Sequence, residues 1–291
     1  MIRRFSQVDV FTTEPLRGNP VAVVLDSEGL STEQMLAFTA WTNLSEATFL
    51  LPPTNPEADY AVRIFCPGRE LPFAGHPTLG SCHAWLEAGG MAHGEQIVQE
   101  CGVGLVRIAR DVEAARLAFA APPLRRSGPL DPESLTRLIA GLGLAEGDVL
   151  DHSWCDNGPG WQALLLRDAQ TVMSVNPDPG VLAGLDVGIV GLHPPGSEVD
   201  VEVRAFFPGN AGLAEDPVTG SLNAALAQWL IGSGRLPGAY VAAQGTALGR
   251  AGRVHITSGS PSGADSGANA DEDAVWVGGG CVTVVSGTVQ I

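Results

Sequence analysis

Residues 63–90 read RIFCPGRELPFAGHPTLGSCHAWLEAGG, and residues 204–234 read RAFFPGNAGLAEDPVTGSLNAALAQWLIGSG on the same plan. The opening arginines of the two copies, Arg63 and Arg204, stand 141 positions apart (204 − 63). Each copy predicts a strand, a Pro-Gly turn, a loop and then an apolar helix that starts at a proline. A repeat separated by about half the chain indicates two similar domains, each with strands wrapped around its own buried helix.

The two central helices are predicted over residues 77–88 and 217–231. Of the 291 residues, 45% are hydrophobic, which is enough for two cores, and only 16% are charged. The 37 glycines and 21 prolines indicate many turns and short strands. We therefore expect an α+β fold with one domain of residues 1–117 plus 280–291 and a second domain of residues 118–279, because the last strand is expected to cross back.

Charge and composition argue against several classes of protein. A formal net charge of −16 repels phosphate backbones, so we expect no nucleic-acid partner. No run approaches the ~20 apolar residues of a membrane span, and the opening MIRRFSQVDVF lacks the apolar stretch of a signal peptide. Five cysteines without CxxC spacing predict free thiols, no metal framework and a cytoplasmic location. Residues 259–274 have the composition of a flexible acidic loop.

Two different ionisable residues precede the prolines of the predicted helices, His76 in one copy and Asp216 in the other. A residue before proline avoids the α region, so both are predicted to lie just outside their helices. Small residues surround the two helix starts: Gly75, Thr78, Gly220 and Ser221. Free backbone N–H groups and the positive end of a helix favour anions, so each start is a candidate site for a small carboxylate substrate.

The residues alone leave structural readings open. Asp216 is a suitable N-cap, which is a sufficient reason for an aspartate there. His76 has the alternative of a hydrogen-bonded core histidine. Glu46 lies between a predicted helix and a predicted strand, where a solvated turn residue is the simpler reading, although such turns often carry functional side chains.

Five stretches closely resemble the phenazine-biosynthesis isomerase family, called PhzF-like. They are GNPVAVV (18–24), NLSEATF (43–49), ELPFAGHPTLG (70–80), EDPVTGS (215–221) and VGGG (277–280). The resemblance covers essentially the whole chain. It implies the diaminopimelate-epimerase fold, in which two pseudo-symmetric domains each wrap a curved β-sheet or barrel around a central helix. It also implies an active site between the domains and a homodimer.

The resemblance further implies a cofactor-free isomerisation of trans-2,3-dihydro-3-hydroxyanthranilate, a step of phenazine biosynthesis. In that family the glutamate of NLSE moves a proton from one ring carbon to another, and the matching residue here is Glu46. The histidine of GHPT and the aspartate of DPxTGS correspond to His76 and Asp216, which we expect to be catalytic as well. We expect contacts with the substrate from six further residues, namely Asn19, Ser45, Gly75, Thr78, Gly220 and Ser221.

Two alternatives to this isomerase remain. One is a member of the same fold that binds a small molecule or another protein without catalysis. The other is an amino-acid or hydroxy-acid epimerase that uses Glu46 and either His76 or Asp216 as opposed bases. Racemases of this fold place one cysteine at each helix start, where this chain has histidine and aspartate, so racemisation by two thiols is disfavoured.

Overall fold

The computed structural model describes residues 1–209, 212–259 and 274–291. The chain divides into two compact units with boundaries after residue 120 and after residue 277, against the expected positions after 117 and after 279. The predicted acidic loop, residues 259–274, lies outside the described residues except at its two ends.

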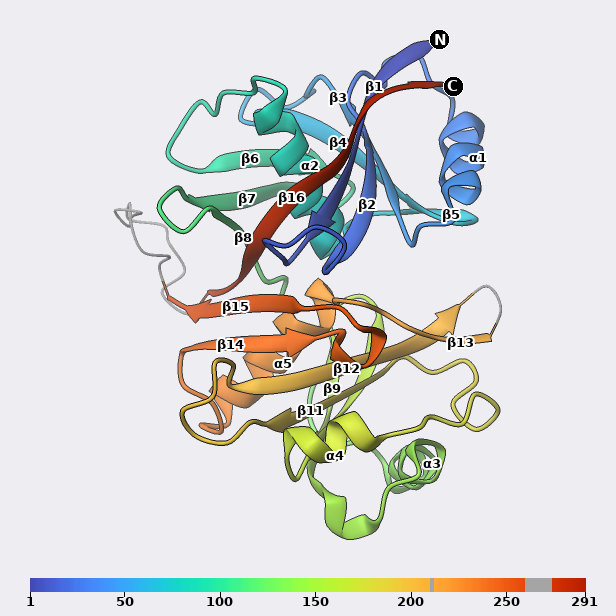
Figure 1. Cartoon of the computed structure of the whole chain (residues 1–291), viewed down its shortest axis with the longest axis vertical. Helices are drawn as coiled ribbons and strands as arrows, with labels where there is room; N and C mark the ends of the chain where they lie inside the picture. The colour runs from blue at the N-terminus through green and yellow to red at the C-terminus, as the bar shows by residue number, and fades with distance from the viewer. Residues whose placement is uncertain (210–211, 260–273) are drawn as a thin grey trace. The chain divides into compact units, whose positions relative to one another are not determined.

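Unit 1 is a closed β-barrel (Figure 1). Its strands are β1 (Ile2–Val10), β2 (Asn19–Val24), β3 (Ala47–Leu51), β4 (Tyr60–Cys66), β6 (Ile97–Cys101), β7 (Gly104–Asp111), β8 (Arg116–Ala120) and β16 (Val275–Gln290). They follow this order around the barrel, and β16 then pairs with β1, from Ile2 opposite Gln290 to Val10 opposite Cys281. The short strand β5 (Arg69–Leu71) forms a hairpin with β4. The last strand of the chain thus closes the barrel of unit 1.

Helix α2 (Gly75–Glu87) fills this barrel and contacts β1, β2, β3, β6 and β8. Leu79 and Cys82 are fully buried, as an apolar helix enclosed by strands requires. Gly80 is needed where the helix approaches β2, because a Cβ at this position would stand 2.3 Å from Cγ1 of Val21. Close helix–strand packing therefore explains the glycine at this position of the first repeat.

Helix α1 (Thr32–Thr42) packs against β3 and β4, and its start is the capping box expected from the sequence. Oγ of Ser31 accepts a hydrogen bond from the backbone of Gln34, whose side chain accepts one in return from the backbone of Ser31. Phe38 of this helix meets Phe49 of β3 edge to face, with ring centroids 6.0 Å apart. The helix thereby fixes the chain just before the NLSE motif.

Unit 2 has a sheet in the order β15-β14-β12-β11-β10-β9. These strands are β9 (Val149–Asp156), β10 (Gly160–Leu166), β11 (Val187–Leu192), β12 (Val201–Gly209), β14 (Ala239–Gln244) and β15 (Gly252–Ser258), with β13 (Gly212–Glu215) paired to β12. Its central helix α5 (Gly220–Gly232) contacts β9 and β15. Leu222 and Leu226 of this helix are buried, which is the pattern of α2 repeated.

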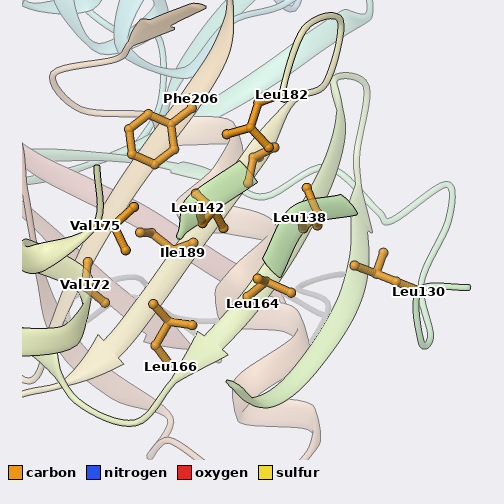
Figure 2. Close-up of a cluster of buried hydrophobic side chains, with 11 residues drawn as sticks. Leu130, Leu138, Leu142, Leu164, Leu166, Val172, Val175, Leu182, Ile189 and Phe206 are labelled. Atoms are coloured by element: carbon orange, nitrogen blue, oxygen red, sulfur yellow. The ribbon is translucent and has the colours of Figure 1, made fainter. Parts of the chain in front are cut away.

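A cluster of leucines, isoleucine, valines and phenylalanine joins the remaining helices of unit 2 to its sheet (Figure 2). These helices are α3 (Pro132–Leu142) and α4 (Ala169–Ser174). Leu138 and Leu142 of α3 and Val172 of α4 face Leu164 and Ile189 of the strands, and all five are fully or almost fully buried. Burying an aliphatic side chain of this size contributes about 2 kcal/mol, so the cluster anchors both helices.

The predicted fold class is confirmed: each unit is a set of curved strands around one buried helix. The five cysteines are free thiols, also as predicted. The predicted helix starts are wrong, because α2 begins two residues before Pro77 and α5 begins three residues after Pro217. Proline is accepted within the first turn of α2, since an N–H there has no partner within the helix anyway.

Candidate active site

Three polar residues of unit 1 meet at the start of α2. Asn19 is the first residue of β2, and Glu46 directly precedes β3. Strands β2 and β3 are parallel neighbours, so their amino ends lie at the same edge of the barrel. His76 is the second residue of α2, whose amino end lies against these strand starts. The topology therefore brings GNP, NLSE and GHPT together, although they are far apart in the sequence.

The side chains of these residues form a chain of contacts. Oε2 of Glu46 lies 3.3 Å from Nε2 of His76, and Nδ1 of His76 lies 3.3 Å from Nδ2 of Asn19. The side chain of His76 is 7% exposed and that of Glu46 is 17% exposed. Glu46 is thus partly removed from water and still accessible, which suits a carboxylate that exchanges a proton with a ligand.

Burial lowers the pKa of His76 from 6.5 to about 3. The positive end of α2 acts in the same direction, since His76 lies in the first turn of the helix. Burial of the whole ring is the dominant cause of this shift. His76 is therefore a neutral imidazole at pH 7 and acts as a hydrogen-bonding group rather than as a cation.

The position of His76 differs from the sequence prediction. The pre-proline rule placed it outside the helix, whereas Ala74 is the N-cap and His76 lies inside the first turn. The first hydrogen bond of the helix runs from the backbone N of Thr78 to the carbonyl oxygen of Ala74, 3.1 Å apart. Enclosure of α2 by the barrel outweighs the weak local preference of a residue before proline.

The other predicted substrate contacts of unit 1 surround this group. Ser45 is half-buried in the bend before Glu46, and Gly75 is the buried first residue of α2. Thr78 is fully buried, and its hydroxyl accepts a hydrogen bond from Nε2 of Gln99, 3.1 Å away. This bond gives Thr78 a structural role, and its contact with a substrate stays a prediction.

In unit 2 a buried glutamine organises the approach to α5. Oε1 of Gln244 accepts hydrogen bonds from the backbone N of Thr219 at 3.0 Å and from Nδ2 of Asn223 at 2.8 Å. Its Nε2 donates to the hydroxyl of Thr219 at 2.9 Å and to the backbone oxygen of Asp216 at 3.2 Å. Thr219 in turn donates its hydroxyl to Oδ2 of Asp216, 2.7 Å away. All four polar positions of Gln244 are thus satisfied, and the carboxylate of Asp216 is fixed by the network.

This network explains why α5 does not start at Pro217. Thr219 is the N-cap with extended backbone, and its N–H is already bonded to Gln244. Asp216 consequently lies four positions before Gly220, the first helical residue, and it is not the N-cap that the alternative reading required. The two repeats therefore present their ionisable residues differently: His76 lies within its helix, and Asp216 lies ahead of its helix.

Ser221, the second residue of α5, is also held in place. Its hydroxyl accepts a hydrogen bond from Nε1 of Trp161 at 3.1 Å, and its backbone oxygen accepts one from Nδ2 of Asn157 at 2.8 Å. Gly220 beside it is buried. The expected substrate contacts of Gly220 and Ser221 stay predictions.

Sequence reasoning missed four buried polar residues that position the two helix starts, namely Gln99, Asn157, Trp161 and Gln244. Gln99 and Gln244 occupy strands without a motif, so nothing in the sequence connected them with a distant helix. Asn157 had a weak signal, because NGPG before an apolar strand resembles GNP before β2.

Within residues 1–209, 212–259 and 274–291, no group of three or more histidine, cysteine or acidic residues is arranged to hold a metal ion. In the same part of the chain, no helix has both the length and the apolar character to cross a membrane.

Repeated helix-centred units of this kind define the class of diaminopimelate-epimerase-like proteins. Within that class the chain belongs to the phenazine biosynthesis-like family, whose model matches residues 8–287. A structure of the PhzF-family protein of Bacillus anthracis covers all of both chains with a TM-score of 0.81 at 21% identity. A hydroxyproline epimerase from Agrobacterium vitis covers 99% of this chain and 91% of its own at 16% identity, with a TM-score of 0.57. Both likenesses concern the fold.

Two of the curated relatives combine more than 30% identity with a match over most of the chain. The trans-2,3-dihydro-3-hydroxyanthranilate isomerase of Pseudomonas aeruginosa is 32% identical over 260 residues, which cover 87% of this chain and 90% of the relative. Antisense-enhancing sequence 1 of Schizosaccharomyces pombe is 33% identical over 297 residues, which cover 97% of each chain. The name of the Pseudomonas aeruginosa relative thus states an isomerisation, whereas the name of the Schizosaccharomyces pombe relative states no reaction.

Proposed function

We propose that the protein is a cofactor-independent isomerase that moves a proton between two carbons of a small carboxylate-bearing substrate. The observation that carries this proposal is the half-buried carboxylate of Glu46, 3.3 Å from a neutral and buried His76. A general base for carbon acids must be partly shielded from water and still reach the substrate, and the partial exposure of Glu46 meets both conditions. The kinship with the Pseudomonas aeruginosa isomerase supports the reaction class.

In the proposed reaction Glu46 removes a proton from one carbon of the substrate. The electron pair left behind is delocalised over the conjugated system, and Glu46 then returns a proton at a second carbon. Substrate and product are isomers, so no oxidant, reductant or leaving group is needed. His76 assists as a neutral hydrogen-bond donor near the carboxylate.

For unit 2 we propose that Asp216 takes part in the proton transfer and that Gly220 and Ser221 bind the substrate. The support is the hydrogen bond from Thr219 that fixes the Asp216 carboxylate, together with the position of Gly220 and Ser221 at the start of α5. Backbone N–H groups at a helix start favour a carboxylate ligand. The homodimer and the cytoplasmic location also remain proposals.

The test uses trans-2,3-dihydro-3-hydroxyanthranilate and a panel of amino and hydroxy acids in D₂O, followed by NMR. We expect deuterium at one carbon of an isomerised product, in the presence or absence of a chelator. Glu46→Gln is expected to lower the rate at least about 100-fold, because a positioned general base contributes about 10²–10⁴-fold. An unchanged rate in Glu46→Gln would refute the role of Glu46.

A second candidate is a binding protein of the same fold without catalytic activity. It is favoured by the Schizosaccharomyces pombe relative, which is more than 30% identical along its length and carries a name that states no reaction. This candidate predicts a higher melting temperature with a ligand of the panel and no turnover of it. An epimerase would instead change the optical rotation of a single stereoisomer, which is measured with the same panel.

A further inference from the structure

We infer that Asn19 is a positioning residue that holds His76 as the neutral tautomer with its proton on Nε2, the ring nitrogen that lies nearer to Glu46. The sequence predicted that Asn19 contacts the substrate. Its side chain instead contacts the ring nitrogen of His76 that faces away from Glu46. The consequence for catalysis rests on the proposed function, whereas the tautomer itself does not.

The hydrogen bond with Asn19 determines the position of the proton on the imidazole. Nδ2 of the Asn19 amide can only donate, so Nδ1 of His76, 3.3 Å away, accepts and carries no proton. A neutral imidazole carries one ring proton, so this proton is on Nε2, which lies 3.3 Å from Oε2 of Glu46. A doubly protonated ring would place an N–H against the amide N–H₂ of Asn19, which disfavours the imidazolium independently of burial.

The backbone around Asn19 is built to hold this amide in place. Asn19 is 1% exposed and pairs with Val10 of β1. The N–H of Gly18 donates to Oδ2 of Asp9 at 3.0 Å, and a Cβ at Gly18 would stand 2.2 Å from the carbonyl oxygen of Val10. Only glycine fits there, so the GN pair sets the amide at a fixed place. An amide buried to this extent needs a hydrogen-bond partner, and His76 is one.

A fixed Nε2–H donor serves the proposed reaction. At 3.3 Å from Oε2 of Glu46, it is near enough to stabilise negative charge on the carboxylate without giving up its own proton. With the other tautomer, a lone pair of Nε2 would face the carboxylate oxygen, and the contact would be repulsive. Asn19 thus acts through His76 and not on the substrate.

The direct test is NMR of the protein labelled with ¹⁵N at its six histidines. Long-range ¹H–¹⁵N spectra at pH 7 distinguish a protonated from an unprotonated ring nitrogen, and the signals absent from His76→Gln assign residue 76. We expect Nδ1 of His76 to be unprotonated and Nε2 to be protonated in the wild type. A proton on Nδ1 of the wild type would overturn the inference without any variant.

Asn19→Asp replaces the donor at this place by an acceptor of the same shape. We expect it to draw a proton onto Nδ1 of His76, either as the other tautomer or as the imidazolium. Asn43→Asp is the matched control, because Asn43 is exposed in the turn after α1 and the substitution adds the same charge. The control is expected to leave the spectrum of His76 unchanged. An unchanged tautomer in Asn19→Asp would overturn the assigned role.

Kinetics with trans-2,3-dihydro-3-hydroxyanthranilate separate this inference from the proposed function. If the wild type turns the compound over, Asn19→Asp is expected to lower kcat about 10- to 100-fold, the usual loss for a residue that orients a functional group, with little change in KM. An unchanged kcat would contradict the positioning role. Absence of turnover in the wild type would count against the proposed function, and the NMR result would still decide the tautomer.

Discussion

Glu46 and His76 lie close together in the structure but come from different kinds of sequence. His76 belongs to the repeated stretch, whereas Glu46 lies outside both copies. Unit 2 has Asp216 at the position of the repeat that corresponds to His76, and Asp216 is held by a threonine hydroxyl rather than by an asparagine amide. The scaffold is duplicated, but the ionisable groups and their partners are not. This asymmetry is consistent with the proposal that a single carboxylate, Glu46, carries the proton.

Burial of His76 predicts a measurable dependence of stability on pH. Its pKa falls from 6.5 to about 3 on folding, so the unfolded chain binds a proton between these values that the folded chain does not bind. Stability therefore falls as the pH is lowered through this window. Between pH 7.5 and pH 5 the contribution is about 2 kcal/mol.

This prediction is checked by urea unfolding of the wild type and of His76→Gln at both pH values. The loss of unfolding free energy on acidification is expected to be about 2 kcal/mol smaller in His76→Gln, because glutamine does not titrate. Other ionisable groups are common to the two proteins and cancel in the comparison. Equal losses in both would show that His76 is not buried in its neutral form.

At the scale of the elements, each central helix is positioned by a buried glutamine from a neighbouring strand. Gln99 of β6 bonds the hydroxyl of Thr78 in α2, and Gln244 of β14 bonds the hydroxyl of Thr219 at the start of α5. Strands β6 and β14 both run parallel to the strand that opens the repeat, β4 in unit 1 and β12 in unit 2. In both units a hydrogen bond from a buried strand glutamine to a threonine hydroxyl therefore links the central helix to the sheet.

Thr219→Val tests the hydrogen bond between Gln244 and Thr219 in unit 2. Valine keeps the shape of threonine, and the cap is preserved because the Thr219 side chain makes no capping hydrogen bond. The variant leaves Nε2 of buried Gln244 with one partner fewer and removes the donor to Asp216, so we expect a loss of about 1–3 kcal/mol in unfolding free energy. Thr219→Ser retains the hydroxyl and is expected to retain most of the stability. Similar losses in both variants would point to packing instead.

Gly80→Ala tests the packing of α2 inside the barrel. The added methyl group meets Cγ1 of Val21 at 2.3 Å, so we expect a destabilisation of about 1–3 kcal/mol, seen as a lower melting temperature in calorimetry. Gly232→Ala in α5 is the matched control, since a Cβ there meets no atom within 4 Å. The control is expected to be neutral or slightly stabilising, because alanine favours the helix. A melting temperature that Gly80→Ala leaves unchanged would contradict the close contact.

At the scale of the whole molecule, the repeat was enough to predict two units with a central helix each, because it preserves the hydrophobic pattern of strand and helix. The closure of unit 1 by β16 against β1 depends on pairing between the two ends of the chain, which no local pattern specifies. The motifs predicted Glu46, His76 and Asp216 as catalytic residues, and these assignments stay predictions. The actual helix starts depended on enclosure and on Gln244. Contacts between distant segments, such as the one between Asn19 and His76, could not be predicted from the sequence.

The central claim is that Glu46 carries a proton between two carbons of the substrate. The most direct measurement is the NMR spectrum of trans-2,3-dihydro-3-hydroxyanthranilate incubated in D₂O with the wild type and with Glu46→Gln. The account predicts an isomerised product with deuterium at its newly protonated carbon for the wild type, and a rate at least about 100-fold lower for Glu46→Gln. Isomerisation and deuterium incorporation at the same rate in both proteins would contradict it.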